Sequence, residues 1–184
     1  LNSILLNIMI LKHTILSLVA LATLSSCQSV KTKDAACADM PPYQGSAAFE
    51  RMKGLVGKWS AESPQMGKMN TEFRVIAGGS VVEERFAEGT PMEMLSTYHD
   101  VNGKLTMTHY CMLRNQPRMK VVKSTADSLT FDLAPTPGLN VEKDRRMHGG
   151  TYTFLDANHF KLEGVSWDNG KSCPCGPPVI FTRS

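Results

Sequence analysis

The sequence lacks a surplus of charge of either sign, since its formal net charge is only +3 over 184 residues. No stripe of lysine and arginine runs along it, which argues against nucleic acid as a partner. It has no helical repeat, and no spacing of side chains reproduces a known catalytic constellation, so an enzyme is unsupported. Its one long apolar run is too short for a membrane-spanning helix, which needs ~20 residues.

That apolar run has the form of an export signal. A short basic region, Lys12 and His13, precedes the apolar segment 14–24, which has the length of a secretory signal core. Leu24-Ser25-Ser26-Cys27 follows directly and matches the bacterial lipobox, in which the cysteine becomes the acylated N-terminus. We therefore expect residues 1–26 to be a lipoprotein signal peptide. The alternative is an ordinary secretory signal followed by a chance cysteine.

The lipid anchor predicts an address in the cell envelope. Two acyl chains on Cys27 would hold the mature protein stably on a membrane. Gln28, in place of an aspartate, favours the periplasmic face of the outer membrane by analogy with other bacterial lipoproteins. Residues 27–46 show no apolar period, so we expect an extended tether there. The chain opens with Leu1, and we expect translation to begin at Met9.

Residues 47–184 predict a single all-β domain with one short helix at its start. Phe49 and Met52 have helical spacing and follow Ser46, a suitable N-cap. Beyond them the apolar pattern has period two and is interrupted by tight turns such as Gly78-Gly79. The expected strands are Gly57–Glu62, Asn70–Ala77, Ser80–Ala87, Met92–His99, Lys104–Met112, Arg118–Ser124, Ser128–Leu133, Thr151–Leu155, Phe160–Trp167 and Pro178–Arg183.

Short strands joined by tight turns favour an up-and-down antiparallel meander. Such a meander must close or stack, because open edges invite aggregation. We expect a closed barrel of about 8–10 strands, with a β-sandwich as the alternative.

Two features resemble the calycin superfamily of lipocalins, fatty-acid-binding proteins and nitrobindin-like barrels. Gly57-Lys58-Trp59 lies on the first expected strand, just after the helix, and Arg183 lies near the end of the last. In calycins a G-x-W tryptophan packs against a basic side chain from the last strand, and such a contact contributes ~0.5–2 kcal/mol. The resemblance implies that Trp59 and Arg183 close one end of a calycin-like barrel.

A closer resemblance covers most of the domain, from Phe49 to Arg183. The segments that carry it are Ile76-Ala77-Gly78-Gly79-Ser80, Gly89-Thr90, Met94, Tyr98-His99, Thr108-His109-Tyr110-Cys111 and Asn115-Gln116-Pro117-Arg118-Met119. They are similar to an uncharacterised family of bacterial lipoproteins with calycin-like barrels and no settled activity. This resemblance strengthens the fold and leaves the function open.

Hairpin geometry predicts which side chains face the barrel lumen. A turn at Asn102-Gly103 gives two strands a shared, largely apolar inner face: Met92, Met94, Ser96, Tyr98, Leu105, Met107, His109 and Cys111. Other strands are expected to add Phe73, Val75, Val82, Glu84, Phe86, Leu129, Phe131, Tyr152, Phe154, Phe160 and Leu162. Soft methionines with a few polar groups are typical of a small-molecule pocket. The same residues would also fill a solid core.

His109 and Cys111 point the same way on one expected strand, as a Cys/His couple or two metal ligands must. Same-face neighbours lie ~7 Å apart, however, which is long for a direct hydrogen bond. No further orienting residue is evident. A buried thiol beside a hydrogen-bonded core histidine is therefore the favoured interpretation, and we assign no catalytic residue and no metal site.

Cys173-Pro174-Cys175 is expected in the loop before the last strand. A Cys-x-Cys spacing occurs in metal and redox sites, but exported proteins meet an oxidising compartment in which disulfides form. A disulfide from Cys37 to Cys173 or Cys175 is the favoured interpretation, because it would fasten the tether to the domain. A metal site is the minority alternative.

Arg118 follows Asn115-Gln116-Pro117 at an expected barrel mouth, where its guanidinium would pair with a carboxylate or phosphate. A solvated loop stiffened by Pro117 is the slightly favoured alternative. The mixed charges of residues 142–146 predict a solvated lid or surface loop.

Together these features predict an envelope-anchored lipoprotein whose barrel binds a small apolar or amphiphilic molecule, as a carrier or sensor. The expected ligand-binding residues are Met92, Met94, Tyr98, Met107, His109, Cys111 and Arg118. The nitrobindin-like resemblance implies an alternative, a haem or metal protein with His109, His99 or His159 as axial ligand. A structural envelope module with a filled barrel is the third interpretation.

Overall fold

The computed structural model of the chain describes residues 41–184, so the expected signal peptide, Cys27 and Cys37 lie outside the described residues. It contains the helix α2 (Ala47–Lys53) and a short 3₁₀ turn, η1 (Ala77–Gly79). The strands are β1 (Gly57–Ser63), β2 (Gly67–Ile76), β3 (Val81–Phe86), β4 (Met94–Val101), β5 (Lys104–Tyr110), β6 (Arg118–Ser124), β7 (Ser128–Leu133), β8 (Arg146–Asp156), β9 (His159–Asp168), β10 (Lys171–Pro174) and β11 (Val179–Arg183). No helix among these elements is long and apolar enough to cross a membrane.

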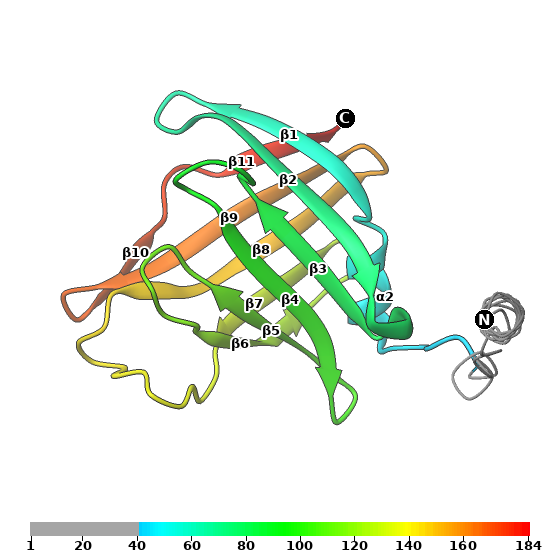
Figure 1. Ribbon diagram of the computed structural model, residues 1–184, viewed down its shortest axis with the longest axis horizontal. Coiled ribbons are helices and arrows are strands. Elements are labelled where there is room, and N and C mark those ends of the chain that lie inside the picture. Colours follow the sequence, from blue (N-terminus) through cyan, green and yellow to red (C-terminus); the bar gives the residue numbers. More distant parts are fainter. Residues whose placement is uncertain (1–40) are drawn as a thin grey trace, which may run out of the picture. The chain divides into compact units, whose positions relative to one another are not determined.

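The strands form a closed barrel (Figure 1). From β1 to β9 each strand pairs antiparallel with its neighbour in the chain, and β11 joins β9 back to β1. β10 and β11 share one edge of β9, because β10 pairs with residues 165–168 and β11 with residues 159–162. They are two halves of one position in the wall, which makes a barrel of 10 strands. The predicted all-β up-and-down antiparallel barrel is confirmed.

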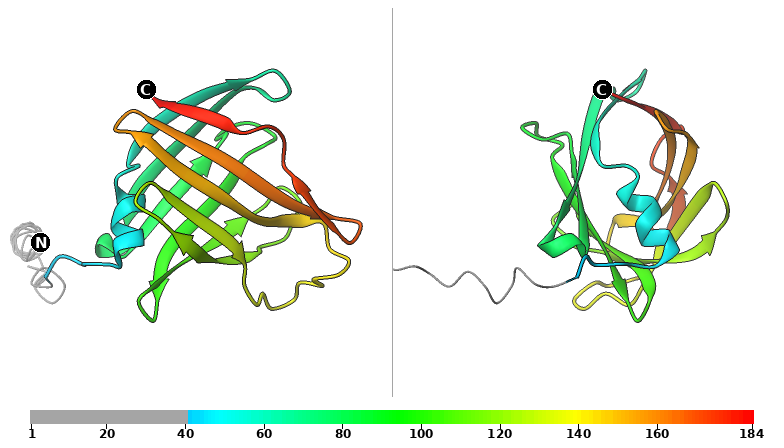
Figure 2. Two further views of the ribbon diagram at one scale, coloured as in Figure 1. Left: turned by 180° about the vertical axis from the view of Figure 1, so that it is seen from behind. Right: turned by 90° about the vertical axis from the view of Figure 1, so that its right-hand side faces the viewer.

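The helix α2 lies across one end of this barrel (Figure 2, right). The Ser46 hydroxyl accepts a hydrogen bond from the Phe49 backbone N–H at 3.2 Å and donates to the Asp100 carboxylate of β4 at 2.8 Å. Phe49 and Met52, which form the apolar face of the helix, are fully buried. The N-cap and the apolar face therefore both fix α2 as a cover over this end.

Aromatic side chains fill the half of the lumen nearest α2. Trp59 donates its indole N–H to the backbone oxygen of Leu55, just after the helix, at 2.6 Å. Its ring meets Phe160 edge to face at 4.9 Å between centroids, and Phe160 stacks on Phe181 at 4.9 Å. Phe73 meets Phe160 from the opposite wall at 5.9 Å. Each such pair adds ~0.5–1.5 kcal/mol beyond its buried area, so this half of the barrel is a packed core.

Arg183 covers the outer side of the same end. Its guanidinium carbon lies 4.1 Å from the centroid of the Trp59 ring, and the two residues are direct partners between β1 and β11. The guanidinium also donates to the backbone oxygens of Val56, Gly54 and Ala157 at 2.7, 3.0 and 3.1 Å. One side chain thus ties together the first strand, the last strand and the chain just after α2.

The fourth predicted strand begins later than its sequence pattern indicates. β4 starts at Met94, because the residues before it form a turn. The backbone N–H of Thr90 donates to the oxygen of Ala87, and that of Glu93 to the oxygen of Thr90, both at 3.1 Å. Met92 therefore lies outside the sheet.

Late in the chain, β8 is longer than predicted, and β10 is a strand that the sequence does not predict. β8 starts at Arg146 rather than Thr151, because glycine at position 149 lets β7 approach: a Cβ there would lie 2.5 Å from the backbone oxygen of Phe131. β10 takes up Cys173 and Pro174, which the sequence assigns to a loop, since residues 171–174 pair with the end of β9.

Candidate functional site

A buried acid lies at the centre of the lumen. Glu84 alternates inward on β3 and is 4% exposed. Its Oε2 accepts hydrogen bonds from the hydroxyls of Tyr98 at 2.5 Å and Tyr152 at 3.0 Å, and its Oε1 accepts one from the Thr71 hydroxyl at 3.1 Å. Four strands, β2, β3, β4 and β8, therefore contribute to one polar cluster inside an aromatic wall.

The protons of this cluster can be counted from its geometry. The hydroxyls of Tyr98 and Tyr152 lie 2.7 Å apart, so these two oxygens and Glu84 Oε2 all contact one another. Each of the three contacts needs one proton, and the two phenols supply only two. Burial raises the pKa of Glu84, against the smaller opposing effect of the hydrogen bonds from Tyr98, Tyr152 and Thr71. The third contact has its proton when Glu84 is protonated, the form that burial favours, and the acid then donates to one of the two phenols.

A second polar pair lies beside this cluster. His109 on β5 is the direct partner of Ser96 on β4, and His109 Nδ1 lies 3.0 Å from the Ser96 hydroxyl. Both residues are 6% exposed. Burial lowers the pKa of His109 to about 4, so the imidazole is neutral at pH 7. Its Nε2 has no hydrogen-bond partner within residues 41–184 and is the nitrogen available to a polar guest.

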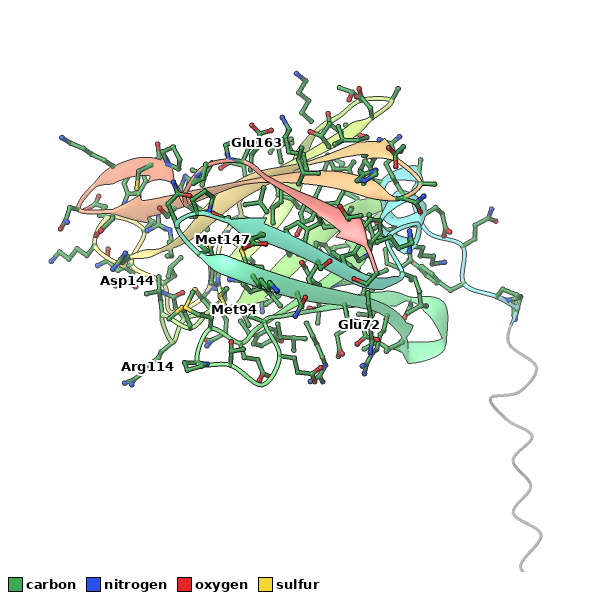
Figure 3. The ribbon with its side chains drawn as sticks, turned by 90° about the horizontal axis from the view of Figure 1, so that it is seen from above. Glu72, Met94, Arg114, Asp144, Met147 and Glu163 are labelled. Atoms are coloured by element: carbon green, nitrogen blue, oxygen red, sulfur yellow. The ribbon has the colours of Figure 1, made fainter. Side chains whose placement is uncertain are left out.

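The half of the lumen away from α2 is filled less tightly. Its inward apolar side chains are only partly buried; they include Phe86, Met94, Met147, Leu162 and Val179. The register places them on the lumen face, because Met94 pairs with Phe86 and Val179 pairs with Leu162. Figure 3 shows Met94 and Met147 toward the end of the barrel opposite α2. The lumen is thus packed with aromatic rings at one end and has a soft apolar rim at the other.

Thiols gather near this rim. Cys173 Sγ lies 3.1 Å from the Ser166 hydroxyl. Burial raises the pKa of the Cys175 thiol, with smaller contributions from Cys173 and Cys111, against a hydrogen bond from Ser166 that lowers it. Because the thiolate is the reactive form, this setting does not favour a nucleophile. Within the described residues Cys111, Cys173 and Cys175 form no disulfide, and Cys37, the predicted partner of Cys173 or Cys175, lies outside those residues.

The chain matches no protein-family model and no curated protein. Of the predicted ligand-binding residues, the structure places Met94, Tyr98, Met107 and His109 on the lumen face. Cys111 is half-buried just after β5.

Some placements predicted from the sequence are wrong. Met92 is 39% exposed in the turn before β4 and does not line the lumen. Val75, expected inside, is 40% exposed because it lies near the η1 end of its hairpin. Arg118, predicted at a barrel mouth, is exposed at the start of β6 beside the loop that follows β5, and its part in ligand binding stays a prediction.

Two of the three predicted haem ligands lie outside the lumen. His99 lies beside Thr106 on the outer face, and His159 begins β9 beside Asp156 with its side chain 41% exposed. His109 is the one of the three that faces the lumen, where it is 6% exposed and pairs with Ser96. Residues 41–184 also contain no group of three or more His, Cys, Asp or Glu placed to hold a metal ion.

Two important residues are poorly marked in the sequence. The alternation of side chains predicts that Glu84 faces the lumen. An acid on an otherwise apolar face is a signal of a functional role, but the sequence alone assigns no role to Glu84. Arg146 belongs to the charged run 142–146, for which a solvated loop is expected. That expectation is wrong for Arg146, which is 1% exposed and packs against Trp167 with its guanidinium carbon 5.1 Å from the ring centroid.

Proposed function

We propose that the chain is an envelope-anchored lipoprotein whose calycin-like barrel binds a small apolar or amphiphilic molecule, as a carrier or sensor. The lipobox at Cys27 supports the anchor and the address on the periplasmic face of the outer membrane. The closed barrel and the contact between Trp59 and Arg183 support the calycin-like assignment.

One observation carries the binding proposal: the two halves of the lumen differ in packing. Side chains near α2 are fully buried, whereas Phe86, Met94, Met147 and others on the same inner faces are only partly buried. A barrel that served only as a solid structural module would bury both halves alike. Incompletely buried apolar side chains inside a wall are the surface that an apolar guest would cover.

The polar groups beneath the rim favour an amphiphile over a pure hydrocarbon. The neutral pair of Ser96 and His109 lies among apolar side chains, and His109 Nε2 is left to hydrogen-bond with a guest. A few placed polar groups fix the orientation of a ligand in an otherwise apolar pocket. Burial favours the neutral forms of His109 and Glu84, so this floor suits an uncharged polar group.

The test uses N-phenyl-1-naphthylamine, a neutral lipophilic dye that fluoresces in apolar sites. We expect saturable fluorescence with the protein purified without its lipid anchor, and native mass spectrometry should detect lipophilic molecules that remain bound. Met94→Trp would place a larger side chain in the space that the dye occupies and weaken dye binding at least about tenfold.

Met92→Trp is the matched control, since it makes the same change two residues away, outside the sheet. It should leave dye binding unchanged, and circular dichroism confirms that both variants fold. If the protein never binds the dye or any co-purified lipophile, or if the two variants lose binding equally, the lumen does not hold a guest.

A further inference from the structure

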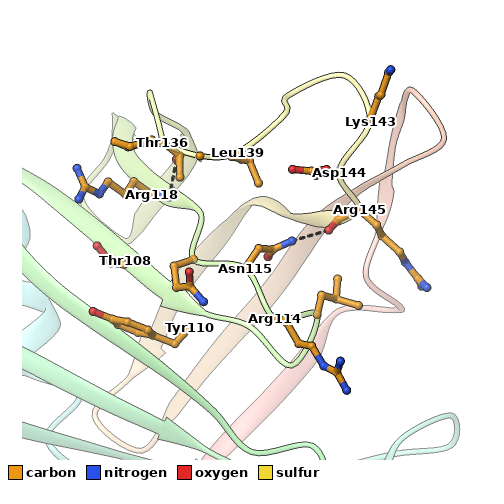
Figure 4. A pocket seen from close by; sticks show the side chains of 14 residues that line it. Thr108, Tyr110, Arg114, Asn115, Arg118, Thr136, Leu139, Lys143, Asp144 and Arg145 are labelled. Atoms are coloured by element: carbon orange, nitrogen blue, oxygen red, sulfur yellow. Dashed lines mark hydrogen bonds between the residues drawn. The ribbon is translucent and has the colours of Figure 1, made fainter.

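A groove of about 750 Å³ lies on the outer wall of the barrel (Figure 4). It runs between the loop that joins β5 to β6 and the loop that joins β7 to β8. The outward side chains of β5 and β6 form its base, so it is separated from the lumen by the barrel wall. Its lining includes Thr108, Tyr110, Arg114, Arg118, Lys143 and Arg145.

The groove carries an excess of positive charge. Its lining holds four cationic side chains and one acid, Asp144. Arg114, Arg118 and Lys143 form no ion pair within the described residues, and the fourth cation meets an aspartate at the end of β9 at 3.5 Å. Unpaired cations around a concave surface attract anionic ligands.

The loop between β7 and β8 is held from beneath. The buried guanidinium of Arg146 donates to the backbone oxygens of Asp144 and Val141, both at 2.8 Å. The indole N–H of Trp167 donates to the backbone oxygen of Glu142 at 3.4 Å. The loop that carries Lys143 is therefore preorganised, which reduces the entropy that a ligand must overcome on binding.

The facing loop is fixed as well. The Asn115 side-chain amide donates to the backbone oxygen of Arg145 at 2.8 Å, and the Arg118 backbone N–H donates to the Thr136 hydroxyl at 2.9 Å (Figure 4). The Asn115 Oδ1 is sealed from solvent without a partner in residues 41–184. Arg114 has a φ of 65°, a left-handed conformation that is uncommon for arginine. Backbone strain of this kind concentrates at ligand sites.

An exposed aromatic ring completes the groove. Tyr110 is 45% exposed and Leu113 is 38% exposed, both in the lining. A tyrosine offers an apolar ring face with a polar tip. The C–H face of a sugar ring matches such a surface, while its hydroxyls match the amides and hydroxyls of Asn115, Gln116 and Thr108.

We propose that this groove binds an acidic saccharide, a sugar that carries carboxylate or phosphate groups. The sugar ring packs on Tyr110, and acidic groups pair with Arg118 or Lys143, which lie on opposite sides of the groove (Figure 4) and present charge-assisted donors. Because the groove lies outside the lumen, this second site stands or falls independently of the lipophilic ligand.

The test is calorimetric titration of the protein with four probes: an oligogalacturonate, glucose 1-phosphate, a neutral maltooligosaccharide and inorganic phosphate. At least one acidic sugar should bind, with an affinity that falls as salt is raised. The first two probes distinguish a carboxylate from a phosphate as the recognised group. The double variant Arg118→Gln/Lys143→Gln should bind at least about fivefold more weakly, and Tyr110→Ser should also weaken binding.

The control Lys120→Gln/Lys123→Gln removes the same charge from exposed positions of β6 outside the groove. It should leave affinity unchanged, and thermal melting confirms that every variant folds. Equal loss in this control would mean attraction by net charge alone and would overturn the proposal. Equal binding of the neutral sugar, equal binding of inorganic phosphate and glucose 1-phosphate, or no binding of any probe would overturn it as well.

Discussion

Replacing Glu84 by glutamine tests whether the acid at the centre of the lumen is neutral. Glutamine has nearly the same shape and carries no charge at any pH. With its amide nitrogen at the position of Oε2 it can donate to both tyrosine oxygens, while its carbonyl oxygen accepts from Thr71. Glu84 is buried and makes three hydrogen bonds to Tyr98, Tyr152 and Thr71. A neutral isostere should therefore change the free energy of unfolding by no more than about 1 kcal/mol at low pH.

The difference should grow with pH. Burial raises the pKa of Glu84 above its ordinary value of 4.5. A raised pKa means that the contribution of this acid to stability is fully present below 4.5 and is lost as the pH rises toward the folded-state value. Between pH 4.5 and the folded-state pKa, the unfolded chain has released a proton that the folded chain keeps. The free energy of unfolding of the parent protein therefore falls by about 1.4 kcal/mol per pH unit relative to that of Glu84→Gln.

Urea unfolding, followed by tryptophan fluorescence between pH 4.5 and 8, measures this difference. Glu83→Gln is the matched control, because it removes the neighbouring acid from the outer face, where Glu83 pairs with Arg85 at 2.7 Å. The stability of Glu84→Gln relative to the parent should increase as the pH rises, whereas that of Glu83→Gln should not show this increase. A constant difference between the parent and Glu84→Gln across this range would refute the neutral cluster.

Two further substitutions test other parts of the barrel by the same unfolding measurement. Burial lowers the pKa of His109 from 6.5 to about 4, so its contribution to stability is present above pH 6.5 and is lost as the pH falls. Between pH 7 and 4 the free energy of unfolding of the parent should fall by on the order of 3 kcal/mol relative to that of His109→Asn. Stability curves that stay parallel over this range would contradict the prediction. Arg183→Leu should cost about 2 kcal/mol at any pH by removing the cation from Trp59 and three donors to backbone oxygens. Arg183→Lys should recover little of this loss, because lysine lacks the planar fork, and full recovery would mean that charge alone matters.

The fold follows from local signals that the sequence carries strongly. Strict alternation from Phe73 through Phe86 and from Met94 through His109, with glycine turns between strands, determines both pairing and inner face. Ser46 marks the start of the helix in the same direct way. The exceptions are a turn around Thr90 and the early start of β8, because each depends on contacts made only after the strands pair.

The polar cluster depends on distance along the chain. Tyr98 and Tyr152 are 54 residues apart, and Tyr152 and Glu84 are 68 apart, yet their oxygens meet. Alternation predicts that all three point inward, but the stagger of strands around a closed barrel decides which inward residues share a level. Their meeting, and with it the neutral state of Glu84, emerges only from the closed structure.

Contacts that form only in the folded barrel also explain why the burial of Arg146 is not predicted. Its neighbours in sequence are charged, and a charged run is most simply solvated. In the barrel the preceding loop folds over it, and the backbone oxygens of Val141 and Asp144 take the place of water. Its side chain therefore acts as a support for a surface loop, and a solvated charge at position 146 would leave the groove above it without a fixed wall.

The unequal packing of the lumen connects stability with binding. The aromatic half, covered by α2 and held by Arg183, contains the best-packed side chains, and it stabilises the closed wall on which the other half depends. Regions that open to admit a ligand belong to the less stable parts of a protein. Glu84 lies between these halves, and as a neutral acid it joins β3 to the opposite wall at β8 through Tyr152 without burying a charge. A ligand can then enter from the soft rim while the wall behind it stays in place.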